Sequence, residues 1–395
     1  MYSVFSLFIS LAVIGLVSLT LIGTIELLIL TVAALFYKRP QMLAAQVTTL
    51  PRLAVVIPAH NEEQGITACL HNLAHAKDAT THCALIVIAD NCTDATAALA
   101  AQAGARVLVR HNLELRGKGY ALDYAFKHLL SEDFDGFLVI DADSCVDVGL
   151  FHQVQLAFAR GQRAVQGYYR VSNAHASKRA RLQNIAQLAF NDVRLLGREQ
   201  LKLSVGILGN GFALSRELLE QVPYEAGSIA EDMEYHLRLV CAGYKIEFLS
   251  WVGVWADTPN QIDNAAVQRS RWEGGRLRLI IEQAPRLAQL VCTGRKDLLE
   301  PLAELLLLPL TYHVALLLLT LLFPVAWAQY YALAALGLVS AHVLFAIRVG
   351  GGGWQAFTTL LSAPFYLLWK LVLLPSIWRN AKRSALWQRT GRELS

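Results

Sequence analysis

The sequence is poor in charge, and its cysteines show no pattern of a disulfide framework or a zinc site. Charged residues make up 17% of the 395 residues, whereas a soluble domain has about a quarter. Together with a mean hydropathy of +0.39, this excludes a wholly soluble protein and a disordered chain. The six cysteines form no C-x-x-C pair and no His/Cys ligand spacing, which indicates buried thiols in a reducing compartment. A net charge of +4 gives no reason to expect a nucleic-acid partner.

Long apolar segments lie at both ends of the chain. Residues 3–37 carry one charge, Glu26, and the run stops at Lys38-Arg39. A helix that crosses a ~30 Å hydrocarbon core needs about 20 such residues, so residues 1–40 are predicted to form a transmembrane helix. A signal peptide is the alternative, but the run is too long and no basic residue precedes it. The basic flank favours a cytoplasmic domain after it, and Glu26 is either a contact for a lipid acceptor or partner helix, or protonated and inert.

The C-terminal apolar region, residues 301–378, is predicted to hold further membrane segments. Residues 305–347 carry no charge, which is enough for a helical hairpin that turns near Phe323-Pro324. The stretch 349–378 is interrupted by four glycines, two prolines and one lysine. We expect it to be broken, re-entrant or interfacial, because a third full span would place the basic tail, 379–395, outside the cell.

Residues 45–260 have the pattern of an α/β domain. Short apolar runs at 53–57, 85–88, 107–109 and 137–140 alternate with helical stretches. This alternation predicts a Rossmann-like, doubly wound and mostly parallel sheet. Ligands of such sheets bind beyond the carboxyl ends of the strands.

Acidic residues follow three of these predicted strands. Residues 58–63 come after the first, Asp90 after the second, and Asp141-Ala142-Asp143 after the fourth. Carboxylates that converge on one crevice repel each other unless a cation or ligand lies between them. Asp141 and Asp143 offer two ligands to Mg²⁺ or Mn²⁺; the alternative is that they cap a turn.

Several short motifs occur in one order along the chain. They are V-I-P-A-H-N-E-E at 56–63, D-N-C-T-D at 90–94, G-K-G at 117–119, D-A-D at 141–143, G-N-G at 209–211, E-D at 231–232 and Q-R-S-R-W at 268–272. In this order, over about Leu53 to Trp272, the chain resembles the membrane-integrated family 2 glycosyltransferases of the GT-A fold, such as cellulose synthases and ceramide glucosyltransferases.

The resemblance implies a role for each motif. It assigns nucleotide-sugar binding to Pro58, His60, Glu62, Asp90, Lys118, Asp141, Gln268, Arg271 and Trp272. It assigns a Mg²⁺ or Mn²⁺ ion to Asp143 and Asp141, and acceptor contacts to Gly209, Asn210 and Trp272. Asp232, with Glu231, is then the catalytic pair, and Asp232 is the general base of a single inverting displacement.

Each of these roles has a plainer alternative. Lys118 would also suit a solvated helix start, and Glu231 and Asp232 would also suit the positive end of a helix dipole. Residues 209–211 would equally form an ordinary turn.

Residues 261–300 are predicted to form amphipathic helices at the membrane surface. Gln268, Arg271 and Trp272 share one helical face, which offers an amide, a guanidinium suited to a diphosphate and a ring suited to a sugar. The arginines that follow, Arg276, Arg278 and Arg286, alternate with apolar residues, as in a helix on an anionic membrane. A solvated surface helix is the alternative.

These observations predict a metal-dependent integral membrane enzyme of a bacterial-type inner or plasma membrane. We expect it to transfer one sugar from a UDP-linked donor to a lipid or glycolipid acceptor. About four apolar segments, and no aromatic-Thr-basic motif after Trp272, distinguish the chain from processive polysaccharide synthases. The Q-x-x-R-W motif keeps that alternative open, since an oligomer could build a channel. An inactive scaffold would lack part of the motif set, and none is missing.

Overall fold

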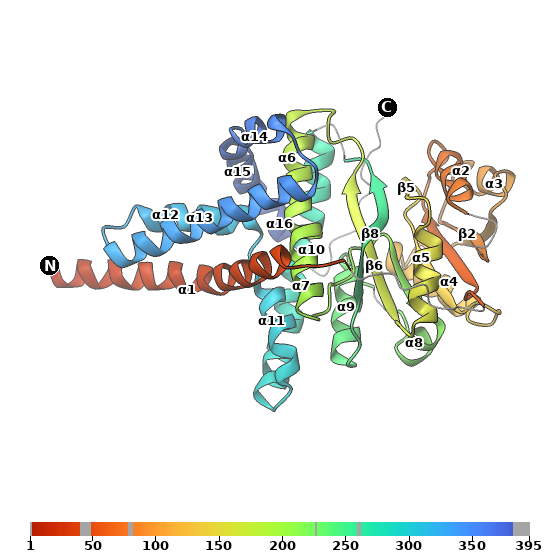
Figure 1. Cartoon of the computed structure of the whole chain (residues 1–395), viewed down its shortest axis with the longest axis horizontal. Coiled ribbons are helices and arrows are strands. Elements are labelled where there is room, and N and C mark those ends of the chain that lie inside the picture. The colour runs from red at the N-terminus through yellow and green to blue at the C-terminus, as the bar shows by residue number, and fades with distance from the viewer. Residues whose placement is uncertain (1, 40–48, 78–81, 226, 259–261, 382–395) are drawn as a thin grey trace.

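The computed structural model describes residues 2–39, 49–77, 82–225, 227–258 and 262–381. Two parts are evident in Figure 1: a group of long helices that projects to one side, and a body built on a β-sheet. Most of the predicted basic tail, from residue 382 on, lies outside the described residues.

The projecting part consists of α1 (Tyr2–Leu35), α12 (Leu310–Leu321) and α13 (Ala326–Val349), which lie side by side (Figure 1). The Thr24 hydroxyl is 3.2 Å from His313 Nε2 of α12 and 2.9 Å from the Tyr331 hydroxyl of α13. Further along the same helices, Thr31 and His342 Nδ1 are 2.8 Å apart. α1 and α13 therefore run in the same direction, and the chain reverses between Leu321 and Ala326.

Within the described residues, two helical segments are long and apolar enough to cross a membrane. They are Ser6–Leu35 and Ala326–Val349, and the bent pair Lys296–Leu306 and Leu310–Leu321, which turns by 77°, would make a third if it formed one broken span. The stretch after α13 is divided into three short helices, α14 (Trp354–Leu360), α15 (Ala363–Val372) and α16 (Leu374–Asn380). α14 packs on α6 (Lys178–Gln187), and α16 packs on α10 (Ile262–Cys292).

The body is built on one sheet of eight strands from the described residues, in the order β3-β2-β1-β4-β7-β6-β8-β5. The strands are β1 (Leu53–Ala59), β2 (Cys83–Asp90), β3 (Arg106–Arg110), β4 (Gly136–Val139), β5 (Ser144–Val146), β6 (Ala164–Val171), β7 (Phe212–Ser215) and β8 (Glu247–Ala256). The first four in space are parallel, as are β6 and β8, whereas β7 is antiparallel to both its neighbours and β5 to β8.

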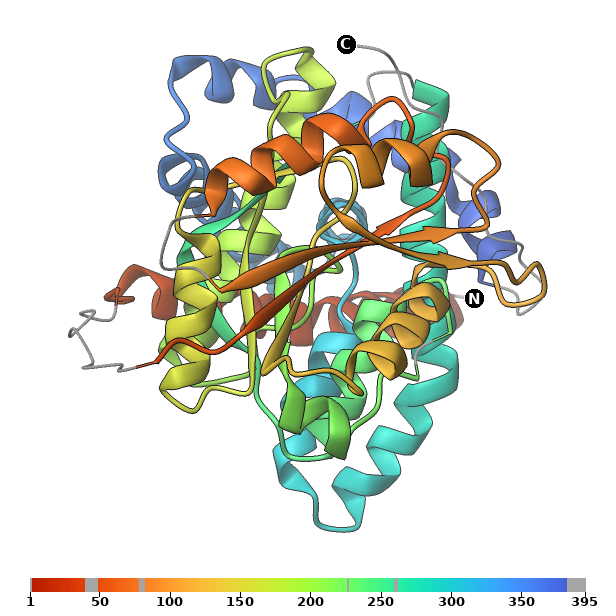
Figure 2. The same ribbon diagram turned by 90° about the vertical axis from the view of Figure 1, so that its right-hand side faces the viewer.

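Helices cover both faces of this sheet (Figure 2). β1 explains why, because it is apolar on both sides: Leu53, Val55 and Ile57 enter one buried cluster, and Ala54 and Val56 enter the other. The first cluster includes α2 (Ile66–Ala76), α3 (Thr96–Gln102) and α5 (Leu150–Ala159), and the second includes α4 (Lys118–Leu129), α8 (Arg216–Gln221) and α9 (Glu231–Cys241). The predicted α/β fold with flanking apolar helices is confirmed.

Two helical segments pack where the projecting helices meet the body. A helical run made of a π-helix (Leu188–Val193) and α7 (Arg194–Gln200) packs on α1 and α13, and α11 (Leu299–Leu306) packs on α10. At the contact of α7 with α1, a Cβ added to Gly197 would lie 2.3 Å from the Leu30 carbonyl oxygen. The helices approach here as closely as glycine allows.

Candidate active site

Asp90 ends β2 and is held in place by a buried arginine. Its Oδ1 atom accepts hydrogen bonds from Arg110 Nη1 (2.5 Å) and from Asn91 Nδ2 (3.1 Å). Asp90 and Arg110 are both buried, and Arg110 also donates to the Leu115 carbonyl (2.8 Å). The carboxylate at this strand end thus has a fixed position, as a nucleoside-binding group requires.

The loops after β1 and β2 are bound to each other. His60 Nδ1 donates to the Asp90 carbonyl (2.7 Å), and the Asn61 side-chain oxygen accepts from Thr93 N (2.8 Å). Glu62 N donates to the Thr96 hydroxyl (2.7 Å). The structure therefore brings together the predicted nucleotide-binding residues His60, Glu62 and Asp90, and Pro58 lies in β1 beside Ile88 of β2.

Lys118, the first residue of α4, links the segment after β4 to the segment before β7. Its ammonium forms an ion pair with Asp141 Oδ1 and donates to the Gly209 carbonyl (2.6 Å). Burial lowers the pKa of Lys118, but the carboxylates of Asp141, Glu231 and Asp232 outweigh burial, and the net pKa is raised. Lys118 is therefore a charged group inside the site and not a solvated surface lysine.

Glu231 and Asp232 are the first two residues of α9, and Asp232 lies against the turn at Gly209. A Cβ added to Gly209 would lie 3.0 Å from Asp232 Oδ2, so this carboxylate rests against the turn that Lys118 binds. Asp232 Oδ1 accepts from Met233 N (2.8 Å). Burial raises the pKa of Asp232, and burial together with repulsion from Asp232 raises the pKa of Glu231. A helix dipole alone would lower both pKa values, so burial outweighs any such effect at this helix start.

Asn210 lies between Gly209 and Gly211, and both glycines have positive φ, +79° and +71°. The Asn210 side chain is fully buried. Its oxygen accepts from Asp141 N (3.1 Å), and its nitrogen donates to the Ser144 hydroxyl (2.8 Å). The Asn210 amide is thus bonded within the protein and links the 209–211 turn to the segment that carries Asp141, and its contact with the acceptor stays a prediction.

Gln268, Arg271 and Trp272 lie on α10. Burial lowers the pKa of Arg271, while the charges of Glu231 and Asp141 oppose that effect. Gly275, one helical turn after Arg271, packs against Ala230, the residue before Glu231. The Arg269 guanidinium stands 5.5 Å from the Trp272 ring centroid. The helix thus adds a cation to the edge of the sheet where Asp141 and Asp232 meet.

Sequence reasoning missed three residues of this region: Arg110, Gln166 and Tyr169. Gln166 is fully buried, accepts from Leu208 N (2.9 Å) and donates to the Asn210 carbonyl (2.8 Å). Burial, and then the charges of Asp141 and Asp143, raise the pKa of Tyr169. Gln166 and Tyr169 lie in β6, which no motif marks, whereas Arg110 follows an apolar run and could have been noted as a cation near Asp90.

Asp141 and Asp143 present a donor set that fits a divalent cation. They follow β4, with Asp143 exposed and Asp141 half-buried. No group of three or more His, Cys, Asp or Glu side chains suited to a metal occurs in the described part of the chain. An exposed and a half-buried carboxylate suit an ion that keeps waters and takes its remaining ligands from phosphates.

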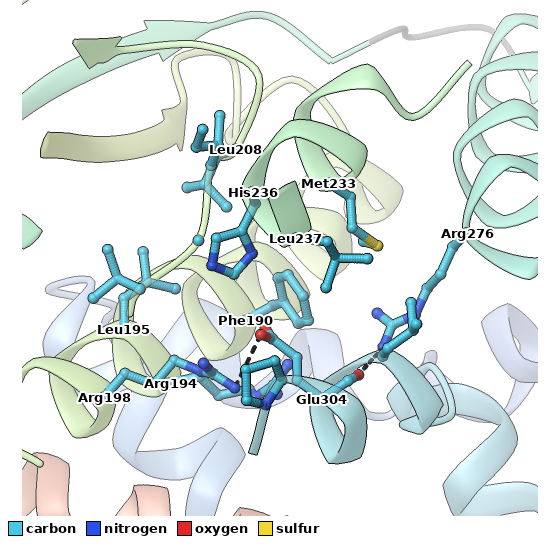
Figure 3. Close-up of a pocket in the computed structure, with 15 residues that line it drawn as sticks. Phe190, Arg194, Leu195, Arg198, Leu208, Met233, His236, Leu237, Arg276 and Glu304 are labelled. Atoms are coloured by element: carbon cyan, nitrogen blue, oxygen red, sulfur yellow. Dashed lines mark hydrogen bonds and ion pairs between the residues drawn. The ribbon is translucent and has the colours of Figure 1, made fainter. Parts of the chain in front are cut away.

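A cavity of about 50 Å³ lies further along α9 (Figure 3). Met233, His236 and Leu237 line it from α9, while Glu231, Asp232 and Lys118 do not. Arg276 reaches it from α10 and donates to the Glu304 carbonyl (2.7 Å).

The charges at this cavity belong to a buried ion network. Arg194 pairs with Glu26 of α1 (2.7 Å), and Arg198 pairs with Glu26 (3.3 Å), Glu304 (3.1 Å) and Glu300. Glu26 therefore contacts a partner helix, α7, in agreement with one of its two predicted roles. Arg276 contacts α11 through the Glu304 carbonyl, and the membrane-surface role of residues 261–300 stays a prediction.

The comparisons with known proteins agree with this geometry. A family model described as "Glycosyltransferase like family 2" matches residues 51–275, more than half of the chain. The chain belongs to this family. The resemblance noted from the motifs is confirmed at the level of the family, and this family 2 glycosyltransferase is an enzyme.

Two curated relatives and one solved structure are similar to it. A probable glycosyltransferase of Bacillus subtilis is 28% identical over 59% of this chain and 57% of its own length. One of Sulfolobus acidocaldarius is 25% identical over 70% of this chain and 61% of its own; the chain thus spans less than two thirds of both relatives.

The solved structure is a mannosyltransferase of Pyrobaculum calidifontis in complex with GDP-Man and Mn²⁺. It matches with a TM-score of 0.57 at 19% identity and covers 95% of this chain and 100% of its own. This likeness supports the fold assignment of the sheet and of the helices beside it.

Proposed function

We propose that this enzyme moves one sugar from a nucleotide-sugar to a lipid or glycolipid acceptor at a membrane, with inversion at the anomeric carbon. The observation that carries the proposal is the contact of Asp232 with the Gly209 turn, which Lys118 joins to Asp141. Asp232 as the base and Lys118 as the diphosphate-binding group then lie at the same part of the sheet edge. In-line displacement requires the base and the leaving diphosphate to lie on opposite sides of the same anomeric carbon.

The donor is assigned to the carboxyl end of the parallel strands. Asp90, His60 and Glu62 would hold the nucleoside, and Lys118 and Arg271 would meet the diphosphate. The GDP-Man bound by the similar mannosyltransferase supports a sugar nucleotide as donor, and both UDP- and GDP-sugars are candidates.

The chemical step needs one base and a stabilised leaving group. Asp232 takes the proton of an acceptor hydroxyl. The oxygen of that hydroxyl bonds to the anomeric carbon, while the bond between this carbon and the phosphate oxygen of the donor breaks. Lys118 and Arg271 meet the charge that develops on the nucleoside diphosphate. Asp143, with Asp141, would hold Mg²⁺ or Mn²⁺, and the bound cation would screen the same charge.

The membrane role is supported by the projecting helices. α1 has 34 residues, about 51 Å at 1.5 Å per residue, which exceeds a ~30 Å hydrocarbon core. Lys38 and Arg39 follow it on the side of the body, so the catalytic body would be cytoplasmic in a bacterial-type inner or plasma membrane. An acceptor with a lipid tail would then reach the site from the bilayer.

Release of nucleoside diphosphate by the purified protein in native-lipid micelles tests this proposal. A panel of UDP- and GDP-sugars, with Mg²⁺ or Mn²⁺ and an EDTA control, should give release with one donor and none with EDTA. Asp232→Asn should lower turnover by about 10²- to 10⁴-fold, the range of a general base, while UDP or GDP still binds.

Two other results have clear meanings. The absence of release with every donor, across several lipid extracts, would contradict the proposal. A long polymeric product in place of a singly glycosylated lipid would identify a processive synthase instead.

A further inference from the structure

The turn of α10 that carries Arg271 and Trp272 is held by contacts with other helices. Glu273, the next residue, forms a buried ion pair with Lys370 of α15. Glu273 Oε2 also accepts a hydrogen bond from the Tyr312 hydroxyl of α12 (2.9 Å). The Lys370 ammonium stands 4.9 Å from the Tyr312 ring centroid. We call these three residues the Glu273 cluster.

Two adjacent glycines let other segments approach the same turn. A Cβ added to Gly274 would lie 2.6 Å from Asn380 Cβ and 2.9 Å from the Ile377 carbonyl of α16. A Cβ added to Gly275 would lie 3.1 Å from the Cβ of Ala230, the residue before Glu231. Successive helical positions point about 100° apart, so α10 is held between α16 and the segment that enters α9.

A hydrogen bond adds to the contact with α16. Asn380 Nδ2 donates to the Ser270 hydroxyl (3.2 Å), one residue before Arg271. Ser270, Glu273 and Gly274 therefore face the C-terminal helices. Arg271 shares a helical face with Gly275, four residues on, and Gly275 packs against Ala230 beside Glu231. The C-terminal helices thus fix the rotation and height of the helix that carries this guanidinium.

The chemistry of the Glu273 cluster suits positioning better than general stabilisation. A buried ion pair gains little net stability, because desolvation offsets much of the attraction. Its geometry is nevertheless strict, since moving either charge leaves the other buried without a partner. A displacement of about 1 Å at a reacting group can cost 10²-fold in rate.

We propose that the Glu273 cluster positions Arg271 and Trp272 for transfer, so that helices α12 and α15 set the activity of the catalytic body. Glu273, Lys370 and Tyr312 are positioning residues, because they touch α10 and not the site of reaction. This inference rests on the proposed transferase function.

The test uses the full chain in native-lipid micelles with the donor that the unsubstituted protein turns over. Turnover is divided by the number of UDP- or GDP-binding sites, so that unfolded protein does not count. Lys370→Met and Glu273→Gln should each lower turnover per site at saturating donor at least 10-fold. The Kd of UDP or GDP should rise by a smaller factor, because Arg271 also meets the diphosphate. Tyr312→Phe, which removes one hydrogen bond, should give a smaller loss of about threefold.

Glu282→Gln is the matched control, because it breaks the Arg278–Glu282 pair (3.1 Å) further along the same helix. It should leave turnover per site unchanged. The reversed pair, Glu273→Lys with Lys370→Glu, should recover part of the activity that each single charge change removes.

The outcomes separate the two proposals. If the unsubstituted protein releases no nucleoside diphosphate, the transferase proposal fails. If it is active and the cluster variants lose only binding sites or melting temperature, with normal turnover per site, the positioning role is overturned. Should Lys370→Met not fold, Tyr312→Phe decides the matter: normal turnover per site for that variant overturns the positioning role.

Discussion

The raised pKa of Asp232, the residue proposed as base, predicts how turnover depends on pH. Burial raises this pKa above that of an ordinary aspartate, and the Lys118 ammonium pulls it back down. A base acts only in its ionised form, so turnover must fall as the pH decreases through the raised pKa. The acid limb of the pH profile should therefore lie at a higher pH than a solvent-exposed aspartate would give.

Lys118→Met tests this assignment. Without the ammonium, the pKa of Asp232 rises further, so the acid limb should move to higher pH. The measurement is turnover against pH at saturating donor, because loss of the Lys118–Asp141 pair also weakens donor binding. An acid limb that stays in place, or moves to lower pH, would remove Asp232 from the role of base.

At the residue scale, much of the site could be predicted because its residues occupy ordinary topological positions. Asp90 ends a parallel strand and Asp141 follows one, so local pattern selected these two residues. Asp232 begins a helix, and only the resemblance to family 2 glycosyltransferases selected it as the base. Gln166 and Tyr169 could not be found in this way. They come from β6, and only the three-dimensional pairing of β6 with β7 and β8 brings them under the site.

Among the elements, the turn at residues 209–211 has the greatest influence on the site. Gly209 has a φ of +79°, and its Cα faces Asp232 Oδ2. Gly104 has a similar φ of +85° with nothing within 4 Å of an added Cβ. The two glycines share a left-handed backbone conformation, in which any other residue is strained, and they differ in contact with Asp232. They therefore form a matched pair.

Gly209→Ala and Gly104→Ala should each destabilise the protein by about 1 to 2 kcal/mol, the cost of a left-handed residue with a side chain. Gly209→Ala should in addition lower turnover, because its methyl group presses on Asp232. Melting temperature and turnover per nucleotide-binding site are measured on both variants. Equal turnover in the two would show that the Gly209 turn does not set the position of the base.

The helices show a limit of sequence periodicity. The spacing of residues 261–300 correctly indicates a helix, but it assigned Arg276 to an anionic membrane surface. In the structure Arg276 donates to the Glu304 carbonyl of α11. Periodicity reports that a face needs a partner, and protein and lipid partners leave the same pattern.

At the scale of the whole molecule, the ion pairs of Glu26 explain how a charged residue is accommodated in an apolar helix. The 24 residues of α1 before it span about 36 Å at 1.5 Å per residue, enough to cross a ~30 Å core. If α1 crosses the bilayer, Glu26 lies at its inner boundary, where Arg194 and Arg198 neutralise the carboxylate. The cost of an unpaired intramembrane charge would then be avoided, and the same ion pairs fix α1 to the body.

This arrangement predicts which side of the membrane each part faces. The turn between α12 and α13 lies near the N-terminus, away from the body (Figure 1). Leu322 in that turn and Val148 in the body are 77% and 74% exposed, so cysteines at the two positions should be equally reactive. If α12 and α13 form a membrane hairpin, the two cysteines lie on opposite sides.

Leu322→Cys and Val148→Cys are each made in a chain whose six natural cysteines are replaced, after its turnover has been checked. A membrane-impermeant maleimide should label Leu322→Cys in intact spheroplasts, and Val148→Cys only in inside-out vesicles. Labelling of both from the same side would mean that the hairpin does not cross the bilayer. The acceptor would then have to reach Asp232 from a membrane surface and not from within the bilayer.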